Sequence, residues 1–417
     1  MAWWVPALAL AQNAGPAQPA EPTPDGPPTP GAAAPLPSDP AAAQPAAAAS
    51  EPPPATDDGK PPPPPAKTTG AEDGWPDMSA FLDEKYGFLP LAMPITEPAV
   101  GYGAMGGVAF LSKSFGDAAA GLGRPNVTFA GGFGTANKSW GAMAMDSRYW
   151  LEDHVQTLAG FIHARVNLDF YGIGEDSALK NAPIRYTLEP TAGALVGKYR
   201  LGESSTWVGL GYAFASTKIT VDSPEATPGL PDHEDRSNLG ALLPSVYYDN
   251  RDNIFTPLRG TYIEASGMIA AKWLGGDDNF EKFGLTILQY VPLPADLYLG
   301  VRAEGDASFG DGPFYTQPYI GLRGVPVMRY QGEEVVVLEA ELRWQFWRRF
   351  SLVGFFGGGN AWNDFEQLDN SQGVVAGGGG FRYELARKFG LHMGVDVAFS
   401  KDTTAFYLQV GSAWMRP

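Results

Sequence analysis

The chain has 417 residues, no cysteine and a formal net charge of −17. Without cysteine it has no thiolate metal ligands, thiol nucleophile or disulfides, and its acidic balance argues against nucleic acid as a partner. No apolar run reaches the ~18 residues that a membrane helix requires. The composition therefore leaves a soluble protein or a membrane β-barrel, whose alternating strands escape hydropathy plots.

The N-terminal segment is expected to lie outside the main fold. Residues 1–11 are typical of the end of a signal peptide, with a small-x-small cleavage site at Ala9-Leu10-Ala11 but no basic start; a random apolar N-terminus is the alternative. Residues 12–74 hold 19 of the 38 prolines and many alanines, which predicts a disordered, partly polyproline tether. Residues 75–94 are expected to form a short collar, either a helix capped by Asp77 or Ser79 or a linker turn.

From residue 95 onward the pattern predicts an all-β fold: a transmembrane antiparallel β-barrel of sixteen strands over residues 95–417. Apolar residues recur at every second position, and those between them carry charge that a dry core would not tolerate. The expected strands are 95–102, 106–113, 126–135, 139–150, 155–170, 184–199, 205–219, 239–249, 260–273, 280–291, 296–308, 334–347, 350–362, 375–385, 389–400 and 405–415.

One face of each strand is expected to contact lipid, and the other to line a polar lumen. The residues predicted to face lipid in four strands are Ile162, Ala164, Val166, Leu168 and Phe170; Leu297, Leu299 and Val301; Leu338, Ala340 and Leu342; and Leu391, Val395 and Val397. The tryptophans near strand ends, where interfacial girdles form, are Trp150, Trp207, Trp273, Trp347, Trp362 and Trp414.

The connections alternate in length along the chain. The long ones, 171–183, 220–238, 309–333 and 363–374, follow odd-numbered strands, and most connections after even-numbered strands are short. Bacterial barrels have short periplasmic turns and long outer loops. An even strand count therefore places both termini in the periplasm, although the long connection 114–125 departs from the rule.

No catalytic, metal or cofactor site is predicted. The sequence lacks a GxSxG, HExxH or Walker motif, and its four histidines are scattered. A GxGxxG match at Gly101–Gly106 has no helix after it and is interpreted as glycine in barrel strands.

The loop 309–333 carries an arginine between Leu322 and Gly324, directly before the strand 334–347. We expect this Arg323 to bond Glu341 inside the lumen, with Glu339 and Glu304 as further candidate partners, and to hold the loop there. The alternative is that Arg323 is one more polar residue lining the lumen.

Four segments carry a resemblance to the BamA/TamA family, the bacterial surface antigen superfamily of outer-membrane assembly factors. Residues 248–262 resemble the family turn DxRDxxFxPxxGxY, with Asp249, Arg251, Asp252, Pro257 and Gly260 in the motif positions, although turn geometry alone would also favour such residues. Leu322-Arg323-Gly324 resembles the VRG tip of the family's sixth outer loop. LEAELRW, at 338–344, resembles the family strand that follows this loop, whose inward glutamate faces the loop arginine. FYGIG, at 170–174, is similar to the FYGIG of POTRA-less and patatin-fused relatives.

The chain departs from the family pattern in several places. Val325 stands where the loop motif has an aromatic residue, and Gly357 stands where many members have an aspartate that pairs with the loop arginine, so a weaker loop contact is expected. Gly411 and Trp414 resemble the C-terminal insertion signal, but a tail follows them. Periplasmic POTRA repeats are not visible in residues 12–74.

The resemblance implies a bacterial outer-membrane barrel that assists the insertion or translocation of outer-membrane proteins or lipids without bond chemistry. Outer-membrane lipids would be its partners, together with unfolded outer-membrane proteins and periplasmic factors as candidates. A weak seam between the first and last strands would open and template an incoming strand. The alternatives are a passive pore or secretion channel plugged by 309–333, and a structural membrane anchor.

Overall fold

The computed structural model describes residues 14–15, 73–79, 87–111, 126–172, 179, 181–221, 233–363 and 371–415. The expected signal segment, most of the tether and the expected helix beyond Ser79 lie outside these residues. No helix among the described residues is long and apolar enough to cross a membrane.

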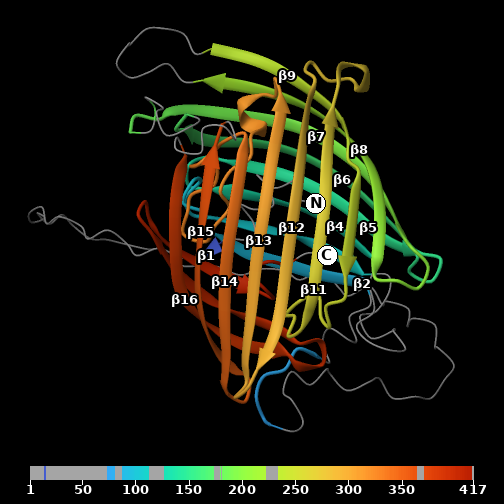
Figure 1. Ribbon diagram of the computed structural model, residues 1–417, viewed down its shortest axis with the longest axis vertical. Coiled ribbons are helices and arrows are strands. Elements are labelled where there is room, and N and C mark those ends of the chain that lie inside the picture. The colour runs from blue at the N-terminus through green and yellow to red at the C-terminus, as the bar shows by residue number, and fades with distance from the viewer. Residues whose placement is uncertain are drawn as a thin grey trace, which may run out of the picture. The chain divides into compact units, whose positions relative to one another are not determined.

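The described strands form one antiparallel barrel in which most strands pair with the next strand along the chain (Figure 1). The strands are β1 (Ala14–Gly15), β2 (Gly87–Ile95), β3 (Gly103–Leu111), β4 (Val127–Thr135), β5 (Trp140–Trp150), β6 (Val155–Phe170), β7 (Ile184–Arg200), β8 (Thr206–Val221), β9 (His233–Leu242), β10 (Ser245–Asp249), β11 (Gly260–Ala270), β12 (Phe280–Leu293), β13 (Leu297–Gly310), β14 (Glu334–Trp347), β15 (Phe350–Trp362), β16 (Gln372–Ala386), β17 (Leu391–Ser400) and β18 (Thr404–Val410). Short 3-10 turns lie at Lys272–Leu274, Phe314–Thr316 and Arg387–Phe389.

The prediction of sixteen barrel strands is confirmed for β2 to β18, because β9 and β10 are two parts of one strand. Both parts pair with β8 and with β11, and the break falls at Leu243 and Pro244. Leu243 still exchanges backbone hydrogen bonds with Gly211 of β8. The proline thus interrupts the regular strand without interrupting the wall.

The predicted position of the first strand, 95–102, was wrong, and the second strand lies two or three residues before its predicted bounds of 106–113. The first runs over Gly87–Ile95 and the second over Gly103–Leu111, so the second half of the expected collar belongs to the barrel wall. Pro90 and Pro94 hid the first strand, since prolines normally argue against a strand. They are tolerated on an edge, where the missing N–H faces away from the neighbouring strand.

The start of the expected collar and the last two residues of the expected tether, together Asp73–Ser79, pack on the end of the barrel that carries the short turns. Arg349, between β14 and β15, contacts Asp73 at 2.6 Å and Asp77 at 2.9 Å. Trp75 packs edge-on against Trp347 and Phe350, and Met78 N–H donates to Leu385 O. We use the name collar for these seven residues below.

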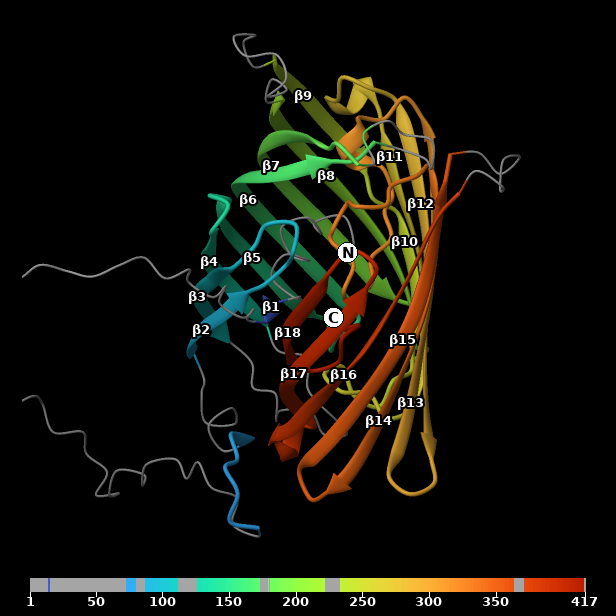
Figure 2. The same cartoon turned by 90° about the vertical axis from the view of Figure 1, so that its left-hand side faces the viewer.

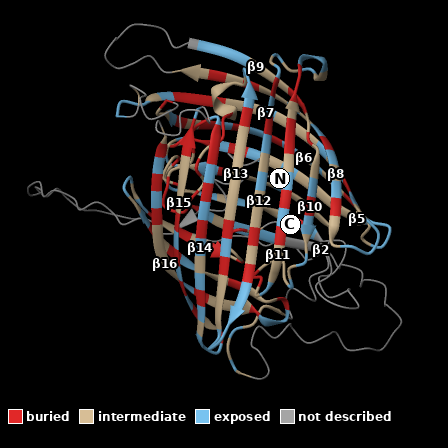
Figure 3. Ribbon diagram, in the orientation of Figure 1, coloured by how far each residue is buried: buried red, intermediate tan, exposed pale blue. Residues whose placement is uncertain are grey.

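Exposure alternates along the strands on the front of the barrel in Figure 3. On β14, Leu338, Ala340 and Leu342 are exposed, whereas Glu339 and Arg343 are buried, as the sequence predicts. Val301 of β13 and Val395 of β17 are also exposed on the outer face.

The face assignment was wrong for the second half of β6. Ile162, Ala164, Val166 and Leu168 are buried inside the barrel, and the residues between them, such as Arg165, face outward. The inner residues form a hydrophobic cluster with Met328 of the loop between β13 and β14. A folded loop thus replaces the polar lumen that we expected behind this strand.

The tryptophan girdle is confirmed only in part. Trp150, Trp273 and Trp347 are exposed, whereas Trp207, Trp362 and Trp414 are buried. Trp207 and Trp414 belong to an inner aromatic cluster with Tyr247, Tyr262 and Tyr290. A tryptophan near a strand end can therefore pack inside the lumen as well as lie at the membrane interface.

The first and last strands meet at a gap that we call the seam. In the described residues no paired register joins β2 to β18. On its open side β18 pairs with β1 instead, through Ala14 opposite Leu408 and Gly15 opposite Phe406 (Figure 2). Among the described residues, Thr96, just after β2, contacts β18 directly, because its Oγ1–H donates to Phe406 O at 2.6 Å.

Candidate functional site

The connection between β13 and β14, residues 311–333, folds into the barrel; we call it the arginine loop. Its two arms pair with each other through a bridge between Tyr319 and Gln331 and a hydrogen bond from Ile320 N–H to Tyr330 O. Ile320, Tyr330 and Gln331 are each at most 2% exposed. A loop this buried is part of the core.

Apolar packing holds the arginine loop against two parts of the inner wall. Ile320, Leu322, Val325 and Tyr330 cluster with residues of β14, β15 and β16. Met328 joins the cluster of Ile95, β4, β6, β7 and β8 on the other side. Each large apolar side chain buried in this way contributes about 1.5–3 kcal/mol. Val325, which stands at the position of the family's aromatic residue, is buried in the first of these clusters.

Arg323 lies at the tip of the loop and is surrounded by three carboxylates. Its Nε–H donates to Glu339 Oε1 at 3.0 Å, and its Nη1–H donates to Asp396 Oδ2 at 3.0 Å. Glu341 Oε2 lies 2.7 Å from Nη1 as an ion-pair contact, and the guanidinium stacks on Phe355 at 3.6 Å. The expected pair with Glu341 is thus present, but the hydrogen bonds go to Glu339 and Asp396.

Two further arginines, Arg382 and Arg302, and the indole of Trp414 bond to two of the same carboxylates. Arg382 pairs with both oxygens of Asp396, at 2.5 and 2.8 Å. Arg302 lies 3.0 Å from Glu339 and donates to Gly321 O at 2.6 Å. Trp414 Nε1–H donates to the second oxygen of Glu339 at 2.7 Å. A network of this kind compensates the charge that burial would otherwise leave costly.

Gly324 connects the arginine loop to the last strand. Its φ of 87° lies in the left-handed region, and its N–H donates to Tyr407 Oη of β18 at 2.7 Å. A Cβ at this position would lie 3.1 Å from Ala398 Cβ. Both the backbone angle and the close approach therefore require glycine.

The same loop also contacts the chain just after the first strand. Val327 N–H donates to Glu97 Oε1 at 3.0 Å, and the Glu97 side chain is fully buried. Glu97 follows β2, and Tyr407 belongs to β18. The loop tip therefore contacts both sides of the seam, and we call these two hydrogen bonds the clip. No sequence motif had indicated it.

The family-like turn, residues 250–259, lies at the short-turn end of the lumen. Arg251 bonds Asp249 at 2.8 and 2.9 Å and stacks on Tyr262. Asp252 Oδ1 accepts the N–H groups of Leu258 and Arg259. Gly260 has a φ of 111°, and a Cβ there would lie 2.6 Å from Arg251 Cα.

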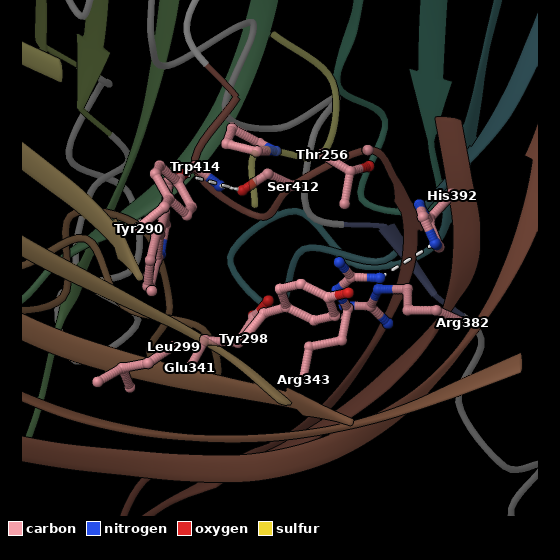
Figure 4. A pocket seen from close by; sticks show the side chains of 13 residues that line it. Thr256, Tyr290, Tyr298, Leu299, Glu341, Arg343, Arg382, His392, Ser412 and Trp414 are labelled. Carbon is pink, nitrogen blue, oxygen red and sulfur yellow. Dashed lines mark hydrogen bonds between the residues drawn. The ribbon is translucent and has the colours of Figure 1, made fainter. Parts of the chain in front are cut away.

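Thr256 and Pro257 of this turn and the C-terminal tail line a small cavity (Figure 4). The tail leaves the wall at Gly411, whose φ is 76°, and Ser412 N–H donates to Phe255 O. Trp414 therefore points inward to Glu339, and the prediction that it lies at the membrane interface was wrong. Arg343 also lines the cavity and bonds His392 at 3.1 Å.

The structure gives no sign of the weaker loop contact that was expected because Gly357 replaces an aspartate. Gly357 pairs with Glu339 across β14 and β15, and a Cβ at Gly357 would lie 2.7 Å from Leu338 O. Asp396 on β17 supplies the additional acid instead. The alternation of 391–400 already placed Asp396 inside, but only the tertiary register shows that it reaches Arg323. No group of three or more His, Asp or Glu in the described part of the chain is arranged to hold a metal ion.

Comparisons with known proteins agree with this architecture. A family model described as the Omp85 superfamily domain matches residues 122–403. The crystal structure of BamA from Haemophilus ducreyi lacking POTRA domains 1–3 is similar, with a TM-score of 0.54 and 14% identity over 79% of this chain and 70% of that one. CdiB from Escherichia coli has a TM-score of 0.55 and 11% identity over 82% of this chain and 66% of that one.

No curated protein matches the chain. At these identities the two structures show the fold alone, whereas the family model covers most of the barrel. The chain belongs to the Omp85 superfamily, whose members are non-enzymatic transport and assembly barrels of the bacterial outer membrane.

Proposed function

We propose that this barrel assists the insertion or translocation of outer-membrane proteins or lipids by opening at the seam, under control of the arginine loop. One observation carries the proposal. The loop tip bonds Tyr407 on one side of the seam and Glu97 on the other, at 2.7 and 3.0 Å. Because no paired register joins β2 to β18 in the described residues, the seam can open when the loop tip releases these two hydrogen bonds, without the loss of a complete strand ladder.

The physical step is an exchange of backbone pairing. Unpaired strand edges recruit extended polypeptide, because their N–H and C=O groups need partners. The barrel supplies such an edge inside the membrane, where an unpaired backbone group costs several kcal/mol. Unfolded outer-membrane proteins are therefore the favoured substrate, with lipids as surrounding partners.

The test joins the loop to the wall covalently. Because the chain has no native cysteine, Glu97→Cys with Val327→Cys gives one defined crosslink across a contact of the clip. In liposomes, wild-type protein should accelerate the folding of a urea-denatured outer-membrane barrel. The oxidised pair should abolish this acceleration, and a reductant should restore it.

Tyr319→Cys with Gln331→Cys is the matched control, since it joins the two arms of the loop without spanning the seam. This pair should keep full activity when oxidised. Acceleration that persists with the 97–327 crosslink, or that is absent from wild-type protein, contradicts the proposal.

A plugged channel is the second candidate, because the arginine loop packs on the inner wall and the C-terminal tail bonds the turn 250–259 inside the barrel. Planar-bilayer recording distinguishes the two. Stable ion conductance in Arg323→Ala, without any folding activity in wild-type protein, would favour the channel. Silence in both assays would favour a structural anchor.

A further inference from the structure

Arg343 of β14 is a buried arginine whose charge is not offset by a carboxylate. It is 6% exposed and lines the cavity between the turn 250–259, the C-terminal tail and the short-turn ends of β13 and β17 (Figure 4). Within the described part of the chain it forms no ion pair, and its Nη2 is buried without a hydrogen-bond partner. The other buried arginines of that part each pair with an acid: Arg302 with Glu339, Arg323 with Glu341, Arg349 with Asp73, and Arg382 with Asp396.

The hydrogen-bond partner of Arg343 is a neutral group. His392 Nδ1 lies 3.1 Å from Gly390 O, and because a carbonyl oxygen can only accept, Nδ1 carries the proton. The Nε2 lone pair then accepts from Arg343 Nη1 at 3.1 Å. The guanidinium also packs on the ring of Tyr298 at 4.6 Å. These contacts fix the direction of the guanidinium without neutralising it, and an uncompensated buried cation is costly.

The cavity beside Arg343 has the size and the donors for a small anion. Its volume of about 30 Å³ is roughly two to three times what one water molecule needs. Thr256 also lines it, is 8% exposed, and has an Oγ1 without a hydrogen-bond partner among the described residues. Glu341 lines the cavity too, but its Oε2 lies 2.7 Å from Arg323 Nη1, so its charge is already paired.

We propose that this cavity binds a small oxyanion of the phosphate type, which accepts hydrogen bonds from Arg343 Nη2–H and Thr256 Oγ1–H. Such bonds are charge-assisted and would satisfy both buried groups at once. The ion would join β14 to the turn 250–259, which the C-terminal tail also contacts. It would enter from the short-turn end, which faces the periplasm in bacterial barrels.

A phospholipid head group carries the same phosphate chemistry. Its acyl chains, however, would have to leave the hydrocarbon outside the wall for the lumen, which is unfavourable. A free ion is therefore the favoured source. This site does not depend on the proposed function, because it needs neither an open seam nor a protein substrate.

Calorimetric titration of the full-length protein in non-ionic detergent tests the site. The probe is inorganic phosphate, at constant ionic strength balanced with chloride, and the wild-type protein should saturate at one phosphate per barrel. Arg343→Gln should raise the Kd at least tenfold, and Thr256→Val, which removes one neutral donor, about threefold. Arg165→Gln, at an arginine on the outer face, is the matched control and should leave the Kd within twofold of wild type.

A pair of variants at position 392 tests the missing charge with Arg343 left in place. His392→Glu would supply a carboxylate to the guanidinium from within the chain, whereas His392→Gln keeps a neutral acceptor of similar length. We expect phosphate to bind at least tenfold more weakly to His392→Glu than to His392→Gln. Heat-modifiable gel mobility identifies variants that fail to fold, and if Arg343→Gln is one of them, the two variants at position 392 decide.

The contrary outcomes are distinct. Absence of saturable phosphate binding in wild-type protein, equal affinity in Arg343→Gln, or equal affinity in the two variants at position 392 overturns the site. Chloride that binds as tightly as phosphate overturns its preference for an oxyanion. Dihexanoylphosphatidylglycerol, titrated as the head-group probe, should bind at least fivefold more weakly than inorganic phosphate, and tighter binding overturns the assignment to a free ion.

Discussion

At the scale of single residues, Arg323 is the charge on which the arginine loop depends. Arg323→Ala would leave Glu339, Glu341 and Asp396 facing one another with one cation fewer. Breaking a buried pair in this way costs about 3–5 kcal/mol. We expect the loop to become accessible to protease in intact membranes and the barrel to lose its heat-modifiable form at a lower temperature.

Removing Glu339 together with Arg323 should be less than additive, because one unpaired charge is removed with the other. Arg165→Ala is the control. Arg165 pairs with Glu189 at 2.8 Å on the outer face, where its side chain is 48% exposed. Such a pair contributes about 0–1 kcal/mol, so equal effects of the two arginine variants would contradict the network.

Two glycines in the same loop give a sharper comparison. Gly324→Ala should loosen the loop, since its φ is positive and the new Cβ would lie 3.1 Å from Ala398 Cβ. Gly321→Ala should be tolerated, because its Cβ would meet only Tyr319, at 3.9 Å. Protease accessibility of the loop reports both, and a loop opened equally by the two variants would argue against the left-handed turn.

These residues show what the sequence could and could not supply. Alternation placed Glu339, Glu341 and Asp396 on inner faces, because side-chain direction follows from strand period alone. It could not place Tyr407 against Gly324, or Glu97 against Val327, since those contacts depend on how a loop packs after the barrel closes. Pro90 and Pro94 misled the prediction because only an edge position makes them compatible with a strand.

At the scale of elements, the two halves of the wall face different surroundings. Val395 on β17 is 49% exposed on a face with apolar neighbours, and Val395→Arg should cost ~2–4 kcal/mol if it lies near the membrane midplane. Leu299→Arg on β13 should behave similarly. On β6, His163 lies on an outer face shared with Arg165 and Asp169, so His163→Arg should be nearly neutral. Refolding yield in vesicles measures all three, and a loss at position 163 as large as at 395 would contradict the reassigned face.

The collar is held by a pair that titrates. The hydrogen bond from Arg349 is the largest cause that lowers the pKa of the Asp73 carboxyl below its ordinary value of 3.8. A lowered pKa means that the contact contributes its stability above that ordinary value and loses it as pH falls through the lowered one. We expect the collar to stay docked at neutral pH and to detach in strong acid, and Asp73→Asn to detach already at neutral pH.

Limited proteolysis of the segment before β2 measures this docking across pH. Asp235→Asn is the control, because Asp235 is an exposed residue of β9 far along the chain from the collar. A collar equally protected at all pH values, or unaffected by Asp73→Asn, would show that the Asp73 pair is not needed and that Trp75, Asp77 and Met78 hold the collar.

At the scale of the whole barrel, the loop and the seam are expected to move as one unit. Tyr407→Phe removes the acceptor of the buried Gly324 N–H, and Glu97→Ala removes the acceptor of the Val327 N–H. Each unsatisfied buried donor costs about 1–3 kcal/mol, so the double variant should shift the balance from clipped to open at least about tenfold. In planar bilayers this appears as more frequent channel openings, although Arg323 and its carboxylates remain intact.

Tyr102→Phe, at a tyrosine that is 50% exposed in the connection after β2, is the matched control and should stay closed. If the double variant opens no more often than this control, Arg323 and the apolar packing hold the loop without these two hydrogen bonds, and the seam is independent of it.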